Sequence, residues 1–313
     1  MSRNVNPKYI ISIFSLPQEV GDLELMCDQL LESFKFLVKP EEWLVDISLG
    51  ISKELVDWEN SNIGIDYFEN KVATLLEKTK DINLNIELSE EIKGCVDKRR
   101  ESYSKHPQAV SLVWLDLDIV FKPKSLACLE NAIISTEEKY PYSIITPEIV
   151  RVWDSSWDCL VNSKFLNKPI RYHRTNNPYT DSTTPSEVSL EVVDNSKSGS
   201  GTFKFGGGLM TCISGKLLRK VGIPESFSPY GQEDTFVMYS TELLKKFKVI
   251  EPYQLKLKGV VVCENIKHRK EFIFKDKLKS INNTVEFRNK NSTLLKIELD
   301  KLLTNLTTRA KLK

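Results

Sequence analysis

Two aspartates, Asp116 and Asp118, interrupt the most apolar stretch of the sequence, residues 110–121. They are two positions apart, so on extended backbone their side chains leave the same side, and at the end of a strand they can converge on one ion. Neither has an evident basic neighbour in the sequence, and burying two like charges without a cation costs roughly several kcal/mol. An oxygen-rich pair suits Mg²⁺ or Mn²⁺, which takes its remaining ligands from water and phosphates. The pair therefore indicates a site for a metal ion and phosphate.

Three consecutive glycines stand just before a later predicted helix. Because Gly206, Gly207 and Gly208 carry no Cβ, they would let the backbone approach a ligand closely. A flexible turn or a bulge would use the same residues. Both interpretations of the glycine triplet stay open.

The segment WDSSWD alternates aromatic and acidic side chains, with Trp153, Asp154, Trp157 and Asp158 in it. Sugars present apolar C–H faces that stack on indoles, while their hydroxyl groups seek carboxylates. Trp153, Asp154 and Trp157 are therefore candidates for an acceptor pocket. The alternative is a helix start with one tryptophan in the core.

Alternating strand and helix patterns surround these residues. Apolar runs and helical spacing predict strands at 9–16, 43–49, 110–121, 142–146 and 260–262, and helices at 23–34, 124–134, 214–221 and from 275 onward. Residues 203–213 and 227–244 are expected to be ordered as well. Residues 51–108 look polar and helical, including a helix at 88–103, and residues 167–204 form a long irregular segment. The alternation is typical of an α/β protein with a mostly parallel central sheet flanked by helices.

Composition excludes several classes of protein. The chain has 313 residues, 41% of them hydrophobic, with 44 basic and 43 acidic side chains, so no global charge attracts nucleic acid or anionic lipid. Six cysteines are scattered singly and do not resemble a zinc site. The N-terminal residues MSRNVNPKY lack the apolar core of a signal peptide, and no later apolar run approaches the roughly 18 to 20 residues needed to span a membrane. We therefore expect a cytoplasmic protein without a membrane partner.

The order of the motifs resembles that of the GT-A glycosyltransferases. In that family a DxD motif closes a central strand, as Asp116 and Asp118 do here, and a glycine loop and an ED motif follow. Here the glycine triplet comes next, then Glu233 and Asp234 within GQED, and then His268 after the last predicted strand. The resemblance covers roughly residues 8–275 in layout. It implies a GT-A (Rossmann-like) domain at 1–275, a C-terminal helical extension at 276–313, and a metal-dependent transferase that uses a nucleotide-diphosphate sugar.

The resemblance also implies roles for individual residues. Asp118 would be the principal metal ligand, Asp116 would contact the ribose or the ion, and His268 would complete the metal site. Asp234 would be the general base, and Glu233 would position the acceptor or share that role. The donor site would include Ser15, Arg99, Arg100, Gly207 and Gly208. For Arg99 and Arg100 a solvated helix end is the alternative, and for His268 an exposed surface histidine.

Several functions remain open at this point. The acceptor could be a hydroxymethylated base of phage DNA, in which case the protein would work in the host cytoplasm, or a surface polysaccharide or lipid-linked glycan. A DNA acceptor would require base extrusion onto aromatics such as Trp153 or Tyr179. The DLDIV sequence also fits a haloacid-dehalogenase-like phosphatase, although that nucleophile usually lies on the first strand. The last alternative is a protein that keeps the fold and binds without turnover.

Overall fold

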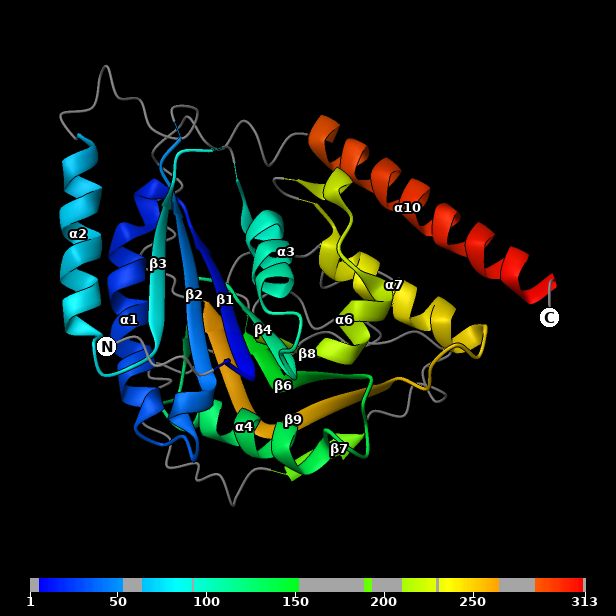
Figure 1. The fold of residues 1–313 in the computed structure, drawn as a ribbon, viewed down its shortest axis with the longest axis horizontal. Helices are drawn as coiled ribbons and strands as arrows, with labels where there is room; N and C mark the ends of the chain where they lie inside the picture. Colours follow the sequence, from blue (N-terminus) through cyan, green and yellow to red (C-terminus); the bar gives the residue numbers. More distant parts are fainter. Residues whose placement is uncertain are drawn as a thin grey trace.

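A mixed sheet of nine described strands forms the middle of the molecule (Figure 1). The computed structural model describes residues 6–52, 64–91, 93–151, 189–192, 210–228, 231–264 and 285–311. Along the sheet the order is β3-β2-β1-β4-β8-β6-β9-β5, and β7 pairs with β9 off this path. The strands are β1 (Tyr9–Ser15), β2 (Trp43–Gly50), β3 (Leu84–Ser89), β4 (Ser111–Leu115), β5 (Ile119–Phe121), β6 (Ser143–Arg151), β7 (Ser189–Val192), β8 (Met210–Ser214) and β9 (Tyr253–Glu264).

The part of the sheet built by the N-terminal strands is parallel. β1 pairs in parallel with β2 and β4, and β2 pairs in parallel with β3. β8 runs antiparallel to β4 and β6, whereas β6 and β9 are again parallel. β5 and β7 run antiparallel to β9. The expected α/β sheet flanked by helices is therefore confirmed, but it is mixed and not mostly parallel, since four of the described strand pairs are parallel and four are antiparallel.

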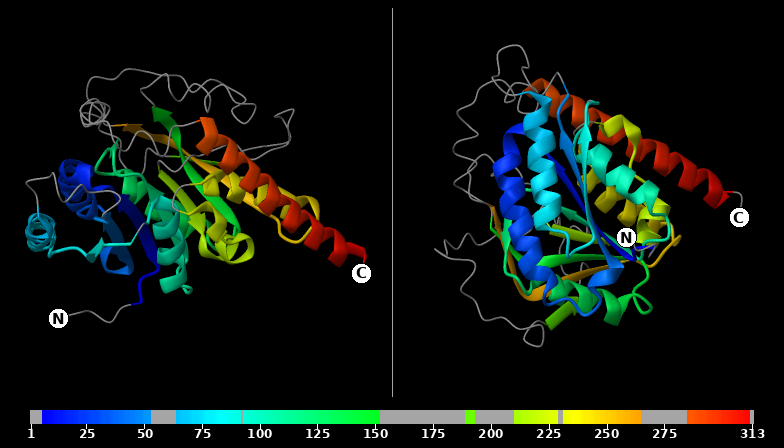
Figure 2. Two further views of the ribbon diagram at one scale, coloured as in Figure 1. Left: turned by 90° about the horizontal axis from the view of Figure 1, so that it is seen from above. Right: turned by 60° about the vertical axis from the view of Figure 1, so that its left-hand side comes forward.

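Helices cover both faces of this sheet (Figures 1 and 2). One face carries α1 (Val20–Phe34), α2 (Ile65–Lys78) and α4 (Ser125–Thr136), and the other carries α3 (Cys95–Lys105), α6 (Gly215–Val221), α7 (Glu233–Lys246) and α10 (Val285–Lys311). The first core lies between the sheet and α1, α2 and α4, and the second core lies between the sheet and α3, α6, α7 and α10. Ile11 belongs to the first core and Ile10 to the second, because successive side chains leave a strand on opposite faces. The sheet therefore has a hydrophobic core on each side.

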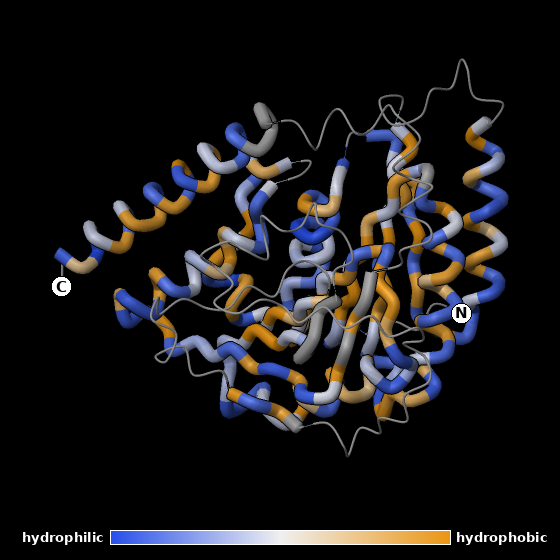
Figure 3. Tube along the Cα trace, turned by 180° about the vertical axis from the view of Figure 1, so that it is seen from behind, coloured by the Kyte–Doolittle hydropathy of each residue, from blue (hydrophilic) through white to orange (hydrophobic). Residues whose placement is uncertain are grey.

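The distribution of hydropathy follows this layering. Figure 3 shows the central strands as mostly hydrophobic, whereas α2 and α10 alternate between hydrophobic and hydrophilic residues along their length. Such alternation is typical of helices with one face on a core and the other in solvent. Among the described helices, none combines the length and the apolar composition needed to span a membrane.

The structure corrects the sequence expectation for residues 51–108. A strand, β3, forms at Leu84–Ser89 where a helix was expected, and α3 begins at Cys95. β3 ends the described strand path, and within it only Ile86 and Ser89 are buried. An edge strand that buries so little carries a weak apolar signal, so its pattern was misinterpreted.

Two other strands differ in extent from the expectation. A turn at residues 116–118 divides the expected strand 110–121 into β4 and β5, which lie apart in the sheet. β9 has 12 residues, far more than the expected 260–262, and it pairs with β5, β6 and β7. Apart from β7, the expected irregular segment 167–204 lies outside the described residues.

Candidate active site

Asp116 and Asp118 lie in the short turn that follows β4. Every residue of β4 is buried, and Asp116 comes directly after its last residue. Leu117 is buried, whereas both aspartates keep partial contact with solvent. The Ile119 N–H donates a hydrogen bond of 3.3 Å to the Asp116 carbonyl oxygen. The turn therefore places both aspartates at the carboxyl end of β4, where ligands bind in open α/β sheets.

Arg99 connects Asp116 to the start of α7. Its Nη2 lies 2.8 Å from Asp116 Oδ1, and its Nη1 contacts Glu233 Oε1. The guanidinium also lies over the Trp114 ring, 4.9 Å from the ring centre. The Arg99 side chain is only 6% exposed. Burial lowers the pKa of Arg99, but the surrounding acidic groups, Glu233 first, outweigh this effect and raise it overall, so Arg99 is a fixed positive charge.

Glu233 and Asp234 form the first turn of α7, where the helix dipole favours negative charge. Burial raises the pKa of Glu233 to about 7, against the opposing attraction of Arg99. Burial likewise raises the pKa of Asp234, although its Oδ1 accepts a hydrogen bond of 2.5 Å from the Thr235 N–H. A carboxyl group with a raised pKa is a stronger base than an ordinary carboxylate, which suits proton abstraction from a hydroxyl group.

Gly231 lets the chain enter α7 closely packed against the second core. A Cβ at this position would lie 2.4 Å from the Cβ of Phe227, which is fully buried. Only glycine permits that approach. The placement of Glu233 and Asp234 thus depends on Gly231, which lies just before them in the chain.

Glu19 belongs to the same region, and sequence reasoning missed it. It ends the short helix η1 (Pro17–Glu19) after β1, and its Oε2 accepts a hydrogen bond of 2.7 Å from the Leu16 N–H. Burial raises the pKa of Glu19 to about 8, with further contributions from the negative charges of Asp118, Asp22 and Asp116. The available signal was an acidic residue four positions after Ser15, at the carboxyl end of the first strand.

The chemistry of this region fits a divalent cation. Glu19 lies within electrostatic range of Asp116 and Asp118, and Asp234 within range of Asp116. Arg99 contacts both Asp116 and Glu233. Asp116 and Asp118 supply oxygen ligands, which Mg²⁺ and Mn²⁺ prefer. Within the described ranges no three His, Cys, Asp or Glu side chains converge as a complete metal site. Two carboxylates would therefore need water, phosphate or residues outside those ranges to complete the coordination shell.

Of the remaining predicted site residues, the structure describes only Ser15 and Arg100. Ser15 is fully buried at the end of β1, and its hydroxyl group donates a hydrogen bond of 3.1 Å to the Leu16 carbonyl oxygen. Arg100 faces away from Asp116, because it hydrogen bonds to the Pro224 carbonyl oxygen and to Asp97. The described residues do not include the other predicted ones, which are Gly206, Gly207, Gly208, His268, Trp153, Asp154, Trp157, Asp158 and Tyr179.

Cys95 lies beside this group of acidic residues. Burial raises the pKa of its thiol well above the ordinary value, and the negative charge of Glu233 adds to the effect. A protonated thiol is a weak nucleophile. The raised pKa of Cys95 therefore does not favour covalent catalysis by its thiol.

Comparison with known proteins gives structural likenesses only. No family model matches the chain, and no curated protein sequence does. Among solved structures, a mannosyltransferase from Pyrobaculum calidifontis, in complex with GDP-Man and Mn²⁺, is 10% identical with a TM-score of 0.47, covering 97% of this chain and 74% of its own. TarS 1-349 from S. aureus is 13% identical with a TM-score of 0.45, and the match covers 96% and 71%. GalNAc-T7 with UDP, GalNAc and Mn²⁺ is 9% identical with a TM-score of 0.45, and the match covers 84% of this chain but 44% of that protein. At these identities and TM-scores, the likenesses by themselves say nothing about what this chain acts on.

Proposed function

We propose that the chain is a metal-dependent glycosyltransferase of the GT-A type, which moves a sugar from a nucleoside diphosphate to an acceptor hydroxyl group. The observation that carries the proposal is the contact of Arg99 with both Asp116 and Glu233. This contact joins the DxD motif to the ED motif, although the two motifs are far apart in the sequence. A donor-binding carboxylate pair and a basic carboxylate pair therefore share one site.

Different described side chains would have different roles in the reaction. Asp116 and Asp118 would hold the cation, and Mn²⁺ or Mg²⁺ bound there would neutralise the charge that builds on the departing diphosphate. Asp234 would take the proton of the acceptor hydroxyl group, a role that its raised pKa supports. Glu233, held by Arg99, would orient the acceptor or share the proton. In this division Arg99 keeps the acidic groups from repelling one another.

The finer proposals mostly concern residues that the structure does not describe. His268 would be the third metal ligand, and Gly207 and Gly208 would line the donor site together with Arg99. Trp153, Asp154 and Trp157 would form the acceptor pocket. The acceptor would be a hydroxymethylated base of phage DNA or a glycan hydroxyl group, and a DNA acceptor would make activity fall steeply with salt.

The phosphatase alternative gains no support from the topology. A haloacid-dehalogenase nucleophile usually lies on the first strand, whereas Asp116 follows β4, the fourth described strand along the chain. Asp116 is also paired with Arg99, and that alternative gives no role to Glu233 or Asp234.

Donor turnover tests the proposal directly. The chain would be incubated with nucleotide sugars, GDP-Man and UDP-GalNAc among them, with Mn²⁺ or Mg²⁺, and with hydroxymethylated duplex, unmodified duplex or a glycan panel. We expect cation-dependent release of nucleoside diphosphate that Asp118→Ala and Asp234→Asn each reduce by about a hundredfold or more. Asp81→Asn is the matched control, because Asp81 is exposed. Phosphate release from simple phosphomonoesters without donor turnover would refute the proposal.

A further inference from the structure

α3 is a highly charged helix whose polar residues are largely buried. Six of its 11 residues are charged, and its buried residues are Val96, Asp97, Lys98, Arg99 and Ser102. Apolar burial stabilises a helix without directing it. Val96 is the only apolar residue among those five, and Cys95 and Tyr103 of α3 pack partly buried against the same core. With so little apolar surface on α3, its buried polar contacts are well placed to fix its register on the sheet.

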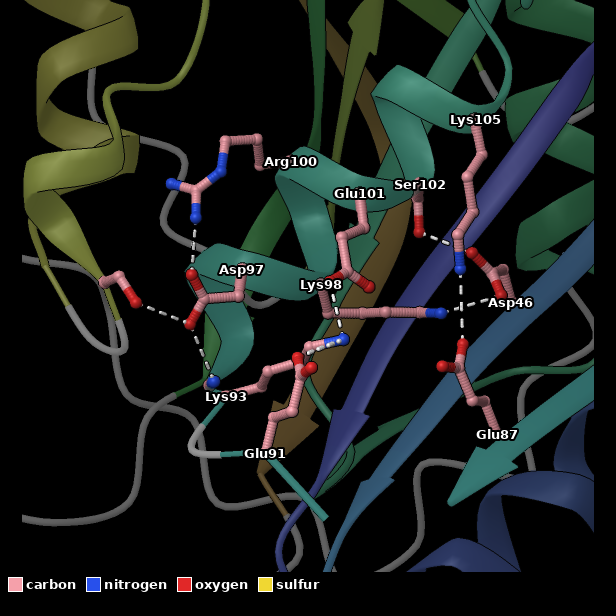
Figure 4. Close-up of polar contacts among 12 residues, drawn as sticks. Asp46, Glu87, Glu91, Lys93, Asp97, Lys98, Arg100, Glu101, Ser102 and Lys105 are labelled. Carbon is pink, nitrogen blue, oxygen red and sulfur yellow. Dashed lines mark hydrogen bonds and ion pairs between the residues drawn. The ribbon is translucent and has the colours of Figure 1, made fainter. Parts of the chain in front are cut away.

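One buried ion pair attaches α3 to the sheet (Figure 4). Lys98 Nζ lies 2.7 Å from Asp46 Oδ1 of β2, and the two side chains are 1% and 2% exposed. Asp46 also accepts hydrogen bonds from Ser102 Oγ over 2.7 Å and from Asn85 Nδ2 over 3.3 Å. Burial raises the pKa of Asp46, but Lys98 outweighs this effect and lowers it overall, so Asp46 is ionised at neutral pH.

Lys98 and Asp46 form a close, buried ion pair. Burial lowers the pKa of Lys98, and the negative charge of Asp46 opposes this effect. Buried ion pairs of this kind contribute little net stability compared with apolar residues of similar volume, yet they can specify a register.

The residues beside Lys98 on α3 contact the candidate site or the segment before α7. Arg99 contacts Asp116 and Glu233. Asp97 accepts a hydrogen bond of 2.9 Å from Ser228 Oγ, and Arg100 donates one of 3.2 Å to the Pro224 carbonyl oxygen. Ser228 and Pro224 belong to the segment that leads into α7. α3 is therefore linked on one side to β2 and on the other to both carboxylate motifs.

We propose that Lys98 and Asp46 are positioning residues: by fixing the register of α3 on β2, their ion pair sets where Arg99 lies and so holds Asp116 and Glu233 in their relative places. The catalytic part of this inference rests on the proposed function. It makes a structural claim as well, because it predicts that Arg99 moves when the pair is lost, whether or not the chain transfers sugar.

A variant in which both Lys98 and Asp46 are replaced by uncharged residues distinguishes a positioning role from a stabilising role. The double variant Lys98→Met with Asp46→Asn removes both charges, while the amide can still bond to Ser102 and Asn85. The single variant Lys98→Met leaves one buried carboxylate without its cation and is expected to unfold at lower denaturant concentration than the double variant. The matched control is Lys105→Met with Glu87→Gln, since this pair also joins α3 to the sheet, at 3.2 Å, but both side chains are largely exposed.

Two readouts decide the inference. Side-chain ¹³C NMR would follow the titration of Glu233, whose pKa rises if Arg99 moves away, because the Arg99 charge opposes the effects of burial and of Asp234. Steady-state kinetics would give kcat and KM for the donor. In the double variant we expect a midpoint of unfolding near that of the parent, an upward shift of the Glu233 titration, and a loss of kcat on the order of tenfold to a hundredfold with a smaller change in KM.

Other outcomes are equally informative. A double variant that keeps both the parent Glu233 titration and the parent kcat would show that the pair only stabilises the fold, and the inference would be wrong. If the parent shows no sugar transfer, the proposed function fails, and the NMR titration still tests the positioning claim. If the double variant does not fold, Ser102→Ala gives the test, because it removes one hydrogen bond to Asp46 and should shift the Glu233 titration in the same direction by less.

Discussion

At the scale of single residues, Arg99 has the largest electrostatic role in the site. Its buried guanidinium contacts Glu233 and Asp116, so removing it takes away the one ion-pair partner of Glu233 among the described residues. We predict that Arg99→Met destabilises the protein more at pH 8 than at pH 5. Without Arg99 the pKa of Glu233 rises further above its unfolded value, so the folded state binds a proton that the unfolded chain releases, and stability falls as the pH rises. Urea unfolding at both pH values measures this difference, with the exposed Arg309→Met as control. An equal loss at both pH values would contradict it.

Glu19 gives a second prediction at this scale. Its pKa of about 8 lies above the ordinary value for glutamate, so between these two values the folded state holds a proton that the unfolded chain does not. Glu19 therefore makes the free energy of unfolding fall as the pH rises from the ordinary pKa of glutamate to about 8, by at most about 1.4 kcal/mol per pH unit.

We therefore expect Glu19→Gln to be more stable than the parent at pH 8, while the two differ less at pH 5. The amide oxygen can still accept the hydrogen bond from the Leu16 N–H. Thermal unfolding in the presence of a chelator measures the effect without a contribution from bound cations, and exposed Glu90→Gln is the control. A parallel pH dependence of the variant and the parent would refute the assignment.

At the scale of elements, the entry into α7 depends on Gly231. An alanine Cβ there would meet the buried Phe227 side chain, so either α7 moves or the second core is distorted. We predict that Gly231→Ala lowers the free energy of unfolding by about 1–3 kcal/mol and reduces kcat by a larger factor than stability alone explains. Denaturant unfolding and steady-state kinetics check this. Gly64→Ala, where a Cβ would meet nothing, should cost less than about 1 kcal/mol and leave kcat unchanged.

The elements also show what could be predicted from the sequence. β1 and β2 were predictable because their buried apolar runs carry a strong signal, and α1 because its apolar residues recur at helical spacing. β3 was not, because an edge strand buries few of its side chains. α3 was recognised as helical, but its buried polar contacts depend on partners that the sequence does not place nearby.

The candidate site could also be predicted only in part from the sequence. The carboxylates Asp116, Asp118 and Asp234 were identified from residue type and motif order, and no evident basic neighbour for the aspartates could be found in the sequence. The structure brings that neighbour, Arg99, from α3. Glu19 was missed because its raised pKa arises from burial and from charges on other segments. Pattern therefore identified chemical groups, and tertiary packing determined their pairing.

At the scale of the whole molecule, the C-terminal helix α10 packs on the second core, to which the N-terminal strands also contribute. Leu294, Leu295, Leu299 and Leu302 pack against the cluster that contains Ile10 and Trp114, and Leu306 is buried within it. Glu298 accepts a hydrogen bond of 3.0 Å from Ser226 Oγ of η6 (Glu225–Phe227), next to the segment that leads into α7. Figure 2 shows α10 lying along α7, with its C-terminal end extending beyond the body.

This packing predicts that α10 unfolds together with the body and not as a separate extension. Leu306 is 5% exposed and Leu303 is 40% exposed, so the two leucines on one helix form a matched pair. We expect Leu306→Ala to lower the stability of the main unfolding transition by about 2–3 kcal/mol, because it removes buried apolar surface and leaves a cavity. Leu303→Ala should change it by less than about 0.5 kcal/mol. Near-ultraviolet circular dichroism, which reports the buried Trp43 and Trp114 far from Leu306 in sequence, would follow the transition. If Leu306→Ala removed only helical signal and left the tryptophan transition unchanged, α10 would be an independent appendage, and its contacts with α7 would not support the site.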